Sequence, residues 1–243
     1  MKKTAGLAAA TVAICLLFSP SARAVTVSLQ QGSNGYTGTR DTALYQDFPN
    51  NSAGGFPNIF GGVTKGAALR RSMISFDLQS AIPAGSTITS ATLRLYCDQG
   101  RAGASPCELR RMTRAWNEGD NQLVNQDEIG QGRAAQAGDS TWANVSHPAT
   151  PWTVAGGEFA ATASGTGVVN AIPGWTVITG AGMANDLQAW LTQPSANYGW
   201  MLLVDEAGAW NAKRFVSSEA NSNRPRLDIE YTPPASVGEW MIY

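Results

Sequence analysis

Strict alternation of apolar and polar side chains along several short segments is the feature that most constrains the fold of this chain. In residues 226–231 every second residue is apolar, from Leu227 to Tyr231, and the residues between them are charged. Residues 69–78 alternate in the same way and place Ile74 and Phe76 on one face. Because successive side chains of a strand point to opposite faces, a period of two predicts half-buried β-strands.

The residues predicted to face the core lie on the apolar face of these strands. They are Ile74, Phe76, Leu78, Leu93, Leu95, Leu202, Val204, Leu227 and Ile229, with Trp116, Trp190 and Trp200 at the margins. Short apolar runs separated by turns, with 26 glycines and 12 prolines, are typical of a β-sandwich with long loops. We therefore predict an all-β, jelly-roll-type sandwich of two mainly antiparallel sheets. One short helical turn is expected near Asp186 to Leu191, where Leu187 and Trp190 would point inward.

The N-terminal segment has the three parts of a secretory signal peptide. Lys2 and Lys3 supply the positive start, residues 5–18 form an apolar run, and Ala22-Arg23-Ala24 is a small-x-small cleavage pattern. A lipid-modified Cys15 is disfavoured because the preceding Ile14 is too large for a lipobox. We predict a signal peptide over residues 1–24, export of the chain to the extracellular side, one domain over 25–232 and a short tail over 233–243.

Charge and hydropathy exclude two classes of partner. Removal of Lys2, Lys3 and Arg23 with the signal peptide would take the formal charge from −1 to −4. The rest of the sequence contains no basic stripe that could bind phosphates, so nucleic acid is not an expected partner. After the N-terminal run, no apolar segment approaches the roughly 20 residues that a transmembrane helix needs, so membrane insertion is not expected.

Two cysteines, Cys97 and Cys107, follow the predicted signal peptide. In an exported protein an even pair usually forms a disulfide, which for so short a loop would stabilise the fold by about 3 kcal/mol. A redox or metal function is disfavoured because the spacing is not CxxC. We predict a Cys97–Cys107 disulfide.

Three segments, in order, resemble the DNRLRE domain family, a group of secreted β-sandwich modules grouped with carbohydrate-binding modules. The first runs from Arg70 to Tyr96 and contains Phe76-Asp77-Leu78 and Ile82-Pro83-Ala84-Gly85; the others are residues 183–203 and the closing hairpin, 212–231. The resemblance covers nearly all of residues 25–232. It implies a secreted, non-catalytic sandwich domain that binds an extracellular polysaccharide.

Function on such a scaffold is expected in loops. Trp152, Trp175 and Trp210 lie in segments without strand alternation, and an exposed indole suits the C–H face of a sugar ring. Arg214 would orient a hydroxyl or a carboxylate of the ligand. These four residues are the predicted polysaccharide site; the alternative for each tryptophan is that it clamps its loop onto the sandwich. Trp142 is the stronger candidate for such a clamp.

Acidic residues in the loop over residues 117–140 suggest a structural calcium ion as a weaker hypothesis. Asp120, Asp127 and Asp139 are the candidates, with Asp41 as a separate candidate near the start of the domain. Their spacing is not that of an EF-hand, and a solvated loop is the alternative.

Two other classes of function remain open. The domain could be a structural cell-surface or matrix component, with surface or matrix proteins as partners and no small ligand. A polysaccharide lyase or hydrolase is the less favoured reading: His147 is the only histidine, and neither Gly-x-Ser-x-Gly nor His-Glu-x-x-His occurs. We therefore expect no enzymatic activity.

Overall fold

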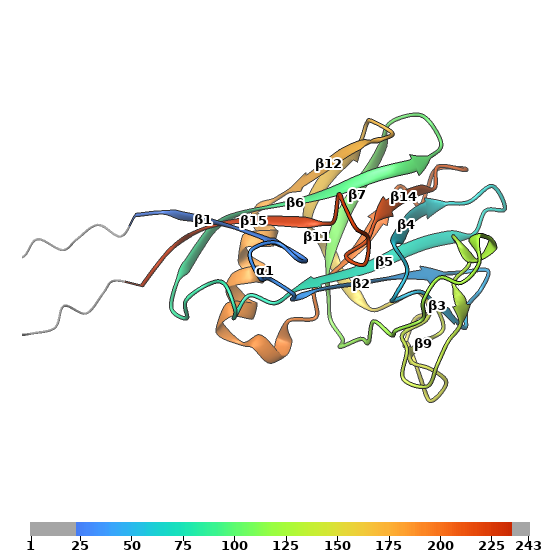
Figure 1. Cartoon of the computed structure of the whole chain (residues 1–243), viewed down its shortest axis with the longest axis horizontal. Coiled ribbons are helices and arrows are strands. Elements are labelled where there is room, and N and C mark those ends of the chain that lie inside the picture. Colours follow the sequence, from blue (N-terminus) through green and yellow to red (C-terminus); the bar gives the residue numbers. More distant parts are fainter. Residues whose placement is uncertain (1–22, 235–243) are drawn as a thin grey trace, which may run out of the picture.

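The structure is a computed structural model that describes residues 23–234 (Figure 1). The predicted signal peptide, apart from its last two residues, and most of the predicted tail lie outside the described residues. Arg23 and Ala24 are exposed and precede the first strand.

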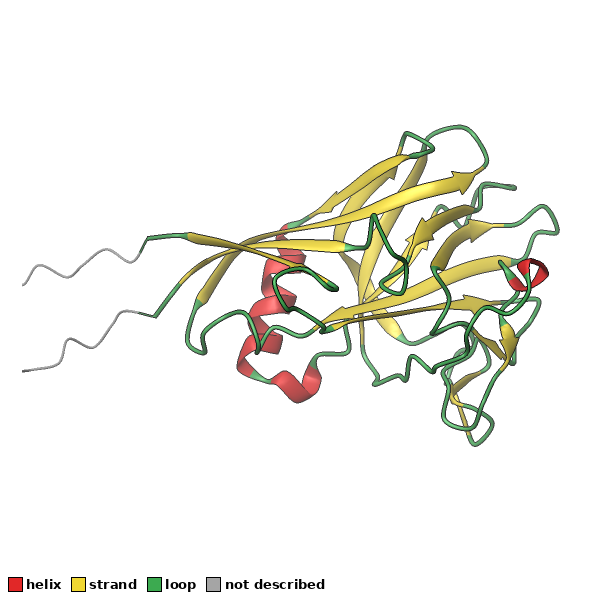
Figure 2. Cartoon of the chain, viewed as in Figure 1, coloured by secondary structure: helices red, strands yellow, loops and turns green. Residues whose placement is uncertain are grey.

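The described chain is mainly β-structure, with 44% in strands and 8% in helix (Figure 2). This confirms the expected all-β class. The strands are β1 (Val25–Gln30), β2 (Thr39–Tyr45), β3 (Asn51–Ser52), β4 (Asn58–Val63), β5 (Leu69–Phe76), β6 (Thr87–Gly100), β7 (Ser105–Met112), β8 (Arg133–Ala134), β9 (Asn144–Ser146), β10 (Thr150–Pro151), β11 (Phe159–Val169), β12 (Gly174–Thr179), β13 (Trp200–Val204), β14 (Lys213–Val216) and β15 (Arg226–Thr232). The helices are α1 (Ala181–Thr192) and two 3-10 turns, η1 (Gln126–Glu128) and η2 (Pro194–Ala196).

The large sheet closes on itself, which corrects the prediction of two separate sheets. Antiparallel pairing runs in the order β6-β12-β11-β7-β13-β5-β4-β14 and returns to β6, so eight strands form a barrel. The closure depends on the long β6, which pairs with β12 along one edge. Along its other edge β6 pairs first with β15, at Thr87 to Arg94, and then with β14, at Cys97 to Gly100. β6 thus takes part in three ladders, two of them along the same edge. This follows from the length of β6, which the alternation of side chains does not reveal.

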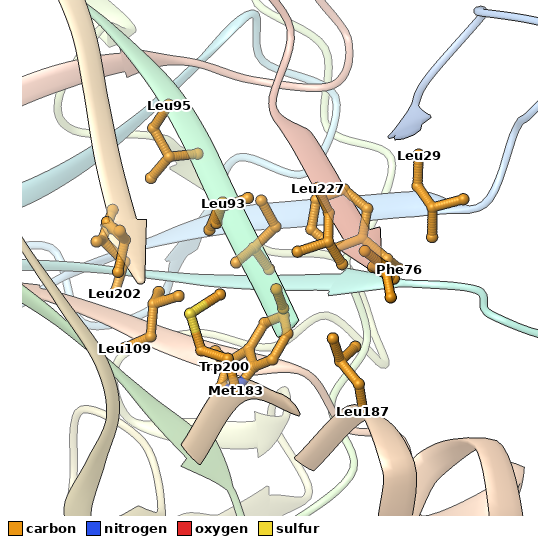
Figure 3. Packing of buried hydrophobic residues seen from close by; sticks show 14 of the residues in the cluster. Leu29, Phe76, Leu93, Leu95, Leu109, Met183, Leu187, Trp200, Leu202 and Leu227 are labelled. Carbon is orange, nitrogen blue, oxygen red and sulfur yellow. The ribbon is translucent and has the colours of Figure 1, made fainter. Parts of the chain in front are cut away.

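The barrel interior is the main core, and the predicted core residues are in it. All nine are at most 2% exposed, and Figure 3 shows several of them packed together. Trp200 lies at the centre rather than the margin, with its ring centroid 4.8 Å from that of Trp190. Phe76→Ala should therefore cost about 3–5 kcal/mol of unfolding free energy.

Helix α1 is longer than the expected single turn. It spans twelve residues and directs Met183, Leu187 and Trp190 into the core. Asp186 fixes its position, because one carboxylate oxygen accepts hydrogen bonds from the Trp200 indole N–H at 2.9 Å and the Ser164 hydroxyl at 2.5 Å. These partners come from distant strands, so the sequence pattern around residues 186–191 could not show how far the helix extends.

A second cluster lies on the outer side of β5, β13 and β7. Met73, Met112 and Met201 project outward there and are buried beneath three tryptophans: Trp116, Trp142 and Trp152. All three tryptophans come from residues 113–158, which we call the cover segment. The outer surface of the barrel is therefore apolar where the cover segment lies on it.

Cys97 and Cys107 are free thiols in this structure, so the predicted disulfide is not formed here. Cys97 lies in β6 and Cys107 in β7, and both are buried. Residues 101–104 connect β6 to β7. Despite this short connection the two strands do not pair as a hairpin, because β7 pairs with β11 and β13 instead. Burial raises the pKa of Cys97 to about 11 and that of Cys107 to about 12, so both thiols are protonated at neutral pH.

Candidate functional site

Trp152 is buried and cannot stack on a ligand. It is 5% exposed, belongs to the cluster under the cover segment, and donates its indole N–H to the carbonyl oxygen of Thr141 at 2.8 Å. The prediction that it contacts a polysaccharide was wrong, and the clamp alternative is the one found. Its loop has no strand alternation, so the local sequence does not indicate burial. The ring is buried by a tertiary contact with the cluster under the cover segment. Trp142 is buried in the same cluster, as expected for a clamp.

Trp210 is exposed, as predicted, but a cation already occupies its ring. The side chain is 46% exposed in the loop between β13 and β14, with a backbone φ of +47°. The Arg101 guanidinium lies 4.1 Å from the ring centroid and the Lys65 ammonium 5.6 Å from it. A sugar would have to displace Arg101 to stack on the face that Arg101 covers.

Arg214 is held by a carboxylate. On β14, its Nε and Nη2 donate to the two oxygens of Asp98 at 2.9 and 2.8 Å. This fork geometry fixes the guanidinium. Arg214 and Trp210 line the same hollow of about 300 Å³, so the structure brings these two predicted residues together.

Trp175 is the most available of the predicted aromatic residues. It lies on strand β12 rather than in a loop, and it is 45% exposed. Its strand partner is Tyr96 of β6, whose ring meets the indole edge-on, with centroids 5.2 Å apart and planes at 71°. The edge contact orients the indole while leaving much of it in solvent.

Two arginines beside Trp175 share one carboxylate. Arg94 donates its Nε to Asp228 at 3.0 Å, and Arg226 donates its Nη2 to the same oxygen at 2.9 Å. The Ser28 hydroxyl donates to the other oxygen at 2.5 Å. Burial alone would raise the pKa of Asp228, but these hydrogen bonds hold it below the usual value. Since each guanidinium carries five N–H donors, more donors are present than one carboxylate can accept.

These groups surround a hollow of about 430 Å³. Its lining consists of Gln30, Arg94, Trp175, Asn223 and Arg226. We call this surface, together with Tyr96 and Asp228, the Trp175 face. It combines an exposed aromatic ring with cationic and amide groups on the outer side of three neighbouring strands. These strands are β15, β6 and β12, which are labelled in Figure 1.

The outward side chains of β6 connect the Trp175 face to the Trp210 hollow. Arg94, Tyr96 and Asp98 alternate with the buried Leu93, Leu95 and Cys97. Asp98 then holds Arg214, and Gly100 lines the Trp210 hollow. From Arg94 to Gly100 the strand spans about 20 Å at 3.3 Å per residue.

The sequence prediction missed Arg94, Tyr96, Arg226, Gln30 and Asn223. For two of them a signal existed: Arg94 and Arg226 occupy the polar phase of strands whose apolar phase was identified as core. That signal marks the residues as outward. It does not show that β6 and β15 pair with Arg94 opposite Arg226, which is what brings the two arginines together.

The acidic residues proposed for calcium do not assemble into one site. Asp120 and Asp127 are exposed, whereas Asp139 is buried and accepts hydrogen bonds from the Ser52 hydroxyl at 2.6 Å and the Gln136 backbone N–H at 2.9 Å. Within residues 23–234, no group of three or more His, Cys, Asp or Glu side chains is arranged to hold a metal ion.

Asp41 belongs instead to a group of carboxylates where the cover segment meets β2. It is buried, and one oxygen accepts the Ser218 backbone N–H at 2.8 Å. Glu118 of the cover segment accepts the Asp41 backbone N–H at 2.6 Å, and Glu219 is close enough to repel both. Burial, opposed in part by the hydrogen bond to Asp41, raises the pKa of Glu118 to about 8; burial and the neighbouring charges also raise the pKa of Asp41.

Comparisons with known proteins supply no relative. No family model matches the chain, and a search of curated proteins gave no match. The resemblance to the DNRLRE family therefore stays a prediction from the motifs. Across residues 23–234, no helix is long and apolar enough to cross a bilayer.

Proposed function

We propose that this protein binds an extracellular polysaccharide on the Trp175 face. The observation that carries the proposal is a half-exposed indole beside two guanidiniums that share a single carboxylate. A sugar ring offers an apolar C–H face for the indole and hydroxyls for the arginine and amide donors. The signal-peptide pattern supports an extracellular ligand.

The charge of the surface favours an acidic polysaccharide. Along β6 and its neighbours, the four arginines Arg94, Arg101, Arg214 and Arg226 are accompanied by three carboxylates, those of Asp98, Asp228 and Glu230. The excess of positive charge would attract uronate or sulfate groups, and the attraction should weaken with salt. The span of about 20 Å along β6 allows contact with several successive sugar units.

The test is the affinity of the protein, without residues 1–24, for acidic and neutral polysaccharides. Trp175→Ala should weaken binding by about 1–2 kcal/mol, which is roughly 5- to 30-fold. Trp210→Ala is a matched control, because the two tryptophans are equally exposed but Arg101 covers the Trp210 ring. Its effect should be clearly smaller.

The outcome decides between three readings. Loss of affinity in Trp175→Ala alone supports the proposed face. Loss in Trp210→Ala alone moves the site to the other end of β6. Binding of no polysaccharide by the unsubstituted protein would overturn the proposal and favour a structural surface component.

A further inference from the structure

We infer that a second cleft, on the outer face of β11, β7 and β13, binds an uncharged oligosaccharide. This cleft has a volume of about 690 Å³, within the range typical of ligand sites. It lies on different strands from the Trp175 face, and the inference does not depend on the function proposed for that face.

Cross-strand register explains how the cleft forms. Thr166 of β11 pairs with Glu108 of β7, which in turn pairs with Leu203 of β13. One step along, Val168 pairs with Pro106. These outward positions make a floor three strands wide, about 10 Å across at the usual strand spacing.

The floor contains apolar side chains beside Glu108 and Thr166, and part of this apolar surface is exposed. Val168 is 42% exposed, on a strand whose other face is buried at Gly165 and Val169. Phe159, at the start of β11, is half-buried and lines the same cleft, as does Leu203. The floor thus offers an apolar surface for the C–H face of a ligand.

Four of the five charged groups that line the cleft form two ion pairs. Arg71 donates to both carboxylate oxygens of Glu206, at 2.6 and 2.9 Å, and Arg110 donates to Glu108 at 2.7 Å. The guanidiniums of Arg71 and Arg110 lie 5.2 and 5.9 Å from the Phe159 ring centroid. The ring and the two ion pairs therefore form one ordered unit.

This arrangement selects the class of ligand. A purely apolar ligand would remove five charged groups from water without replacing their hydrogen bonds to water, which is costly. An anion would be repelled by the carboxylates of Glu108, Glu206 and Asp205. The two arginines at the cleft would attract it only weakly, because they are already neutralised by ion pairs. Sugar hydroxyls both donate and accept, so they can bond to guanidinium and carboxylate edges together while the ring's C–H face covers Val168.

The experiment measures the affinity of the protein, without residues 1–24, for neutral gluco-, xylo-, manno- and galacto-hexasaccharides by calorimetry. We expect at least one to bind with Kd of about 1 mM or tighter. Val168→Arg, which fills the cleft from an exposed position, should weaken that binding by about tenfold or more. Thr166→Arg is a second block on the same strand, and Val124→Arg, at another exposed valine, is the matched control.

Two results would overturn the inference: no neutral hexasaccharide binding by the unsubstituted protein, or unchanged binding in both blocking variants. Tighter binding of a uronate hexasaccharide at the cleft would also contradict it. Trp175→Ala should leave cleft binding unchanged, and Val168→Arg should leave acidic polysaccharide binding unchanged. Failure at one surface is therefore distinguishable from failure at the other.

Discussion

The outer surface of the barrel differs between the part beneath the cover segment and the part at the Trp175 face. Beneath the cover segment, outward residues of β5, β13 and β7 are Met73, Met201 and Met112, and tryptophans bury them. At the Trp175 face, the outward residues of β6 are Arg94 and Tyr96, and nothing described lies over the exposed indole beside them. Outward side chains are thus buried by packing in one region, whereas in the other they stay exposed and form the proposed ligand-binding surface.

The comparison shows that the residues packed over a tryptophan decide whether its ring stabilises the core or stays available at the surface. Trp152 and Trp175 both lie after the first half of the chain in segments that lack helical or strand alternation in sequence. One fills a core with its indole N–H bonded to Thr141, and the other stands on a strand beside free guanidinium donors. Stability and binding should accordingly respond to different substitutions.

The largest expected effect is on stability under the cover segment. Trp152→Ala should lower the unfolding free energy by about 3–5 kcal/mol, since it leaves a cavity and an unpaired Thr141 carbonyl. Trp175→Ala should lower it by less than about 1 kcal/mol, because the ring is half in solvent. Denaturant titration of both variants measures the contrast, and equal losses would remove the distinction between the two regions.

A smaller effect is expected in polysaccharide binding, with the order of the two tryptophans reversed. Trp152→Phe keeps an aromatic ring in the core and should leave affinity for an acidic polysaccharide within about twofold. Trp175→Ala should lose about 1–2 kcal/mol of binding energy. Both are read by affinity electrophoresis at fixed salt; a binding loss in folded Trp152→Phe would show that the cover segment takes part in the site.

Asp228 tests the charge balance of the Trp175 face. Asp228→Asn should lower stability by about 1 kcal/mol through loss of charge-assisted hydrogen bonds, and should raise affinity for an acidic polysaccharide by removing a negative charge. Because the folded pKa is depressed, the stabilisation by Asp228 is present above its unfolded pKa near 4 and is lost as the pH falls through the folded value. Glu230→Gln, two residues along the same strand, is the control. A fall in affinity in Asp228→Asn would show that orienting the arginines outweighs the added charge.

A further prediction concerns pH at the edge of the cover segment. The pKa of Glu118 is raised to about 8, so the folded state holds its proton more tightly than the unfolded state does. Stability is then greatest below the unfolded pKa, falls between about pH 4.5 and 8, and is level above that range. Glu118→Gln should flatten this decline in Tm, whereas Asp120→Asn, at an exposed neighbour, should not. An unchanged pH profile in Glu118→Gln would contradict the assignment.

The core of the barrel was predictable because its signal is local. Alternation assigned Phe76, Leu93, Leu202 and Ile229 to the inward face, and each is buried there. A strand's two faces follow from backbone geometry alone, so no knowledge of its neighbours was needed.

The candidate site was predictable only in part. The exposure of Trp175 and Trp210 was anticipated, but Trp152 was wrongly included and Arg94 and Arg226 were missed. The disulfide prediction rested on export and an even pair of cysteines; in this structure both thiols are free, and β7 pairs with β11 and β13 rather than with β6.

The sequence by itself therefore determined the strand phases, the β class and the polar faces that carry arginines. Only the tertiary structure decided that β6 closes a barrel, that the cover segment buries Trp152, and that Arg94 and Arg226 share Asp228. Each of these rests on contacts between residues far apart in the chain, such as the 134 positions between Arg94 and Asp228. Side-chain alternation specifies which way a residue points, but what it meets there depends on the pairing of distant strands.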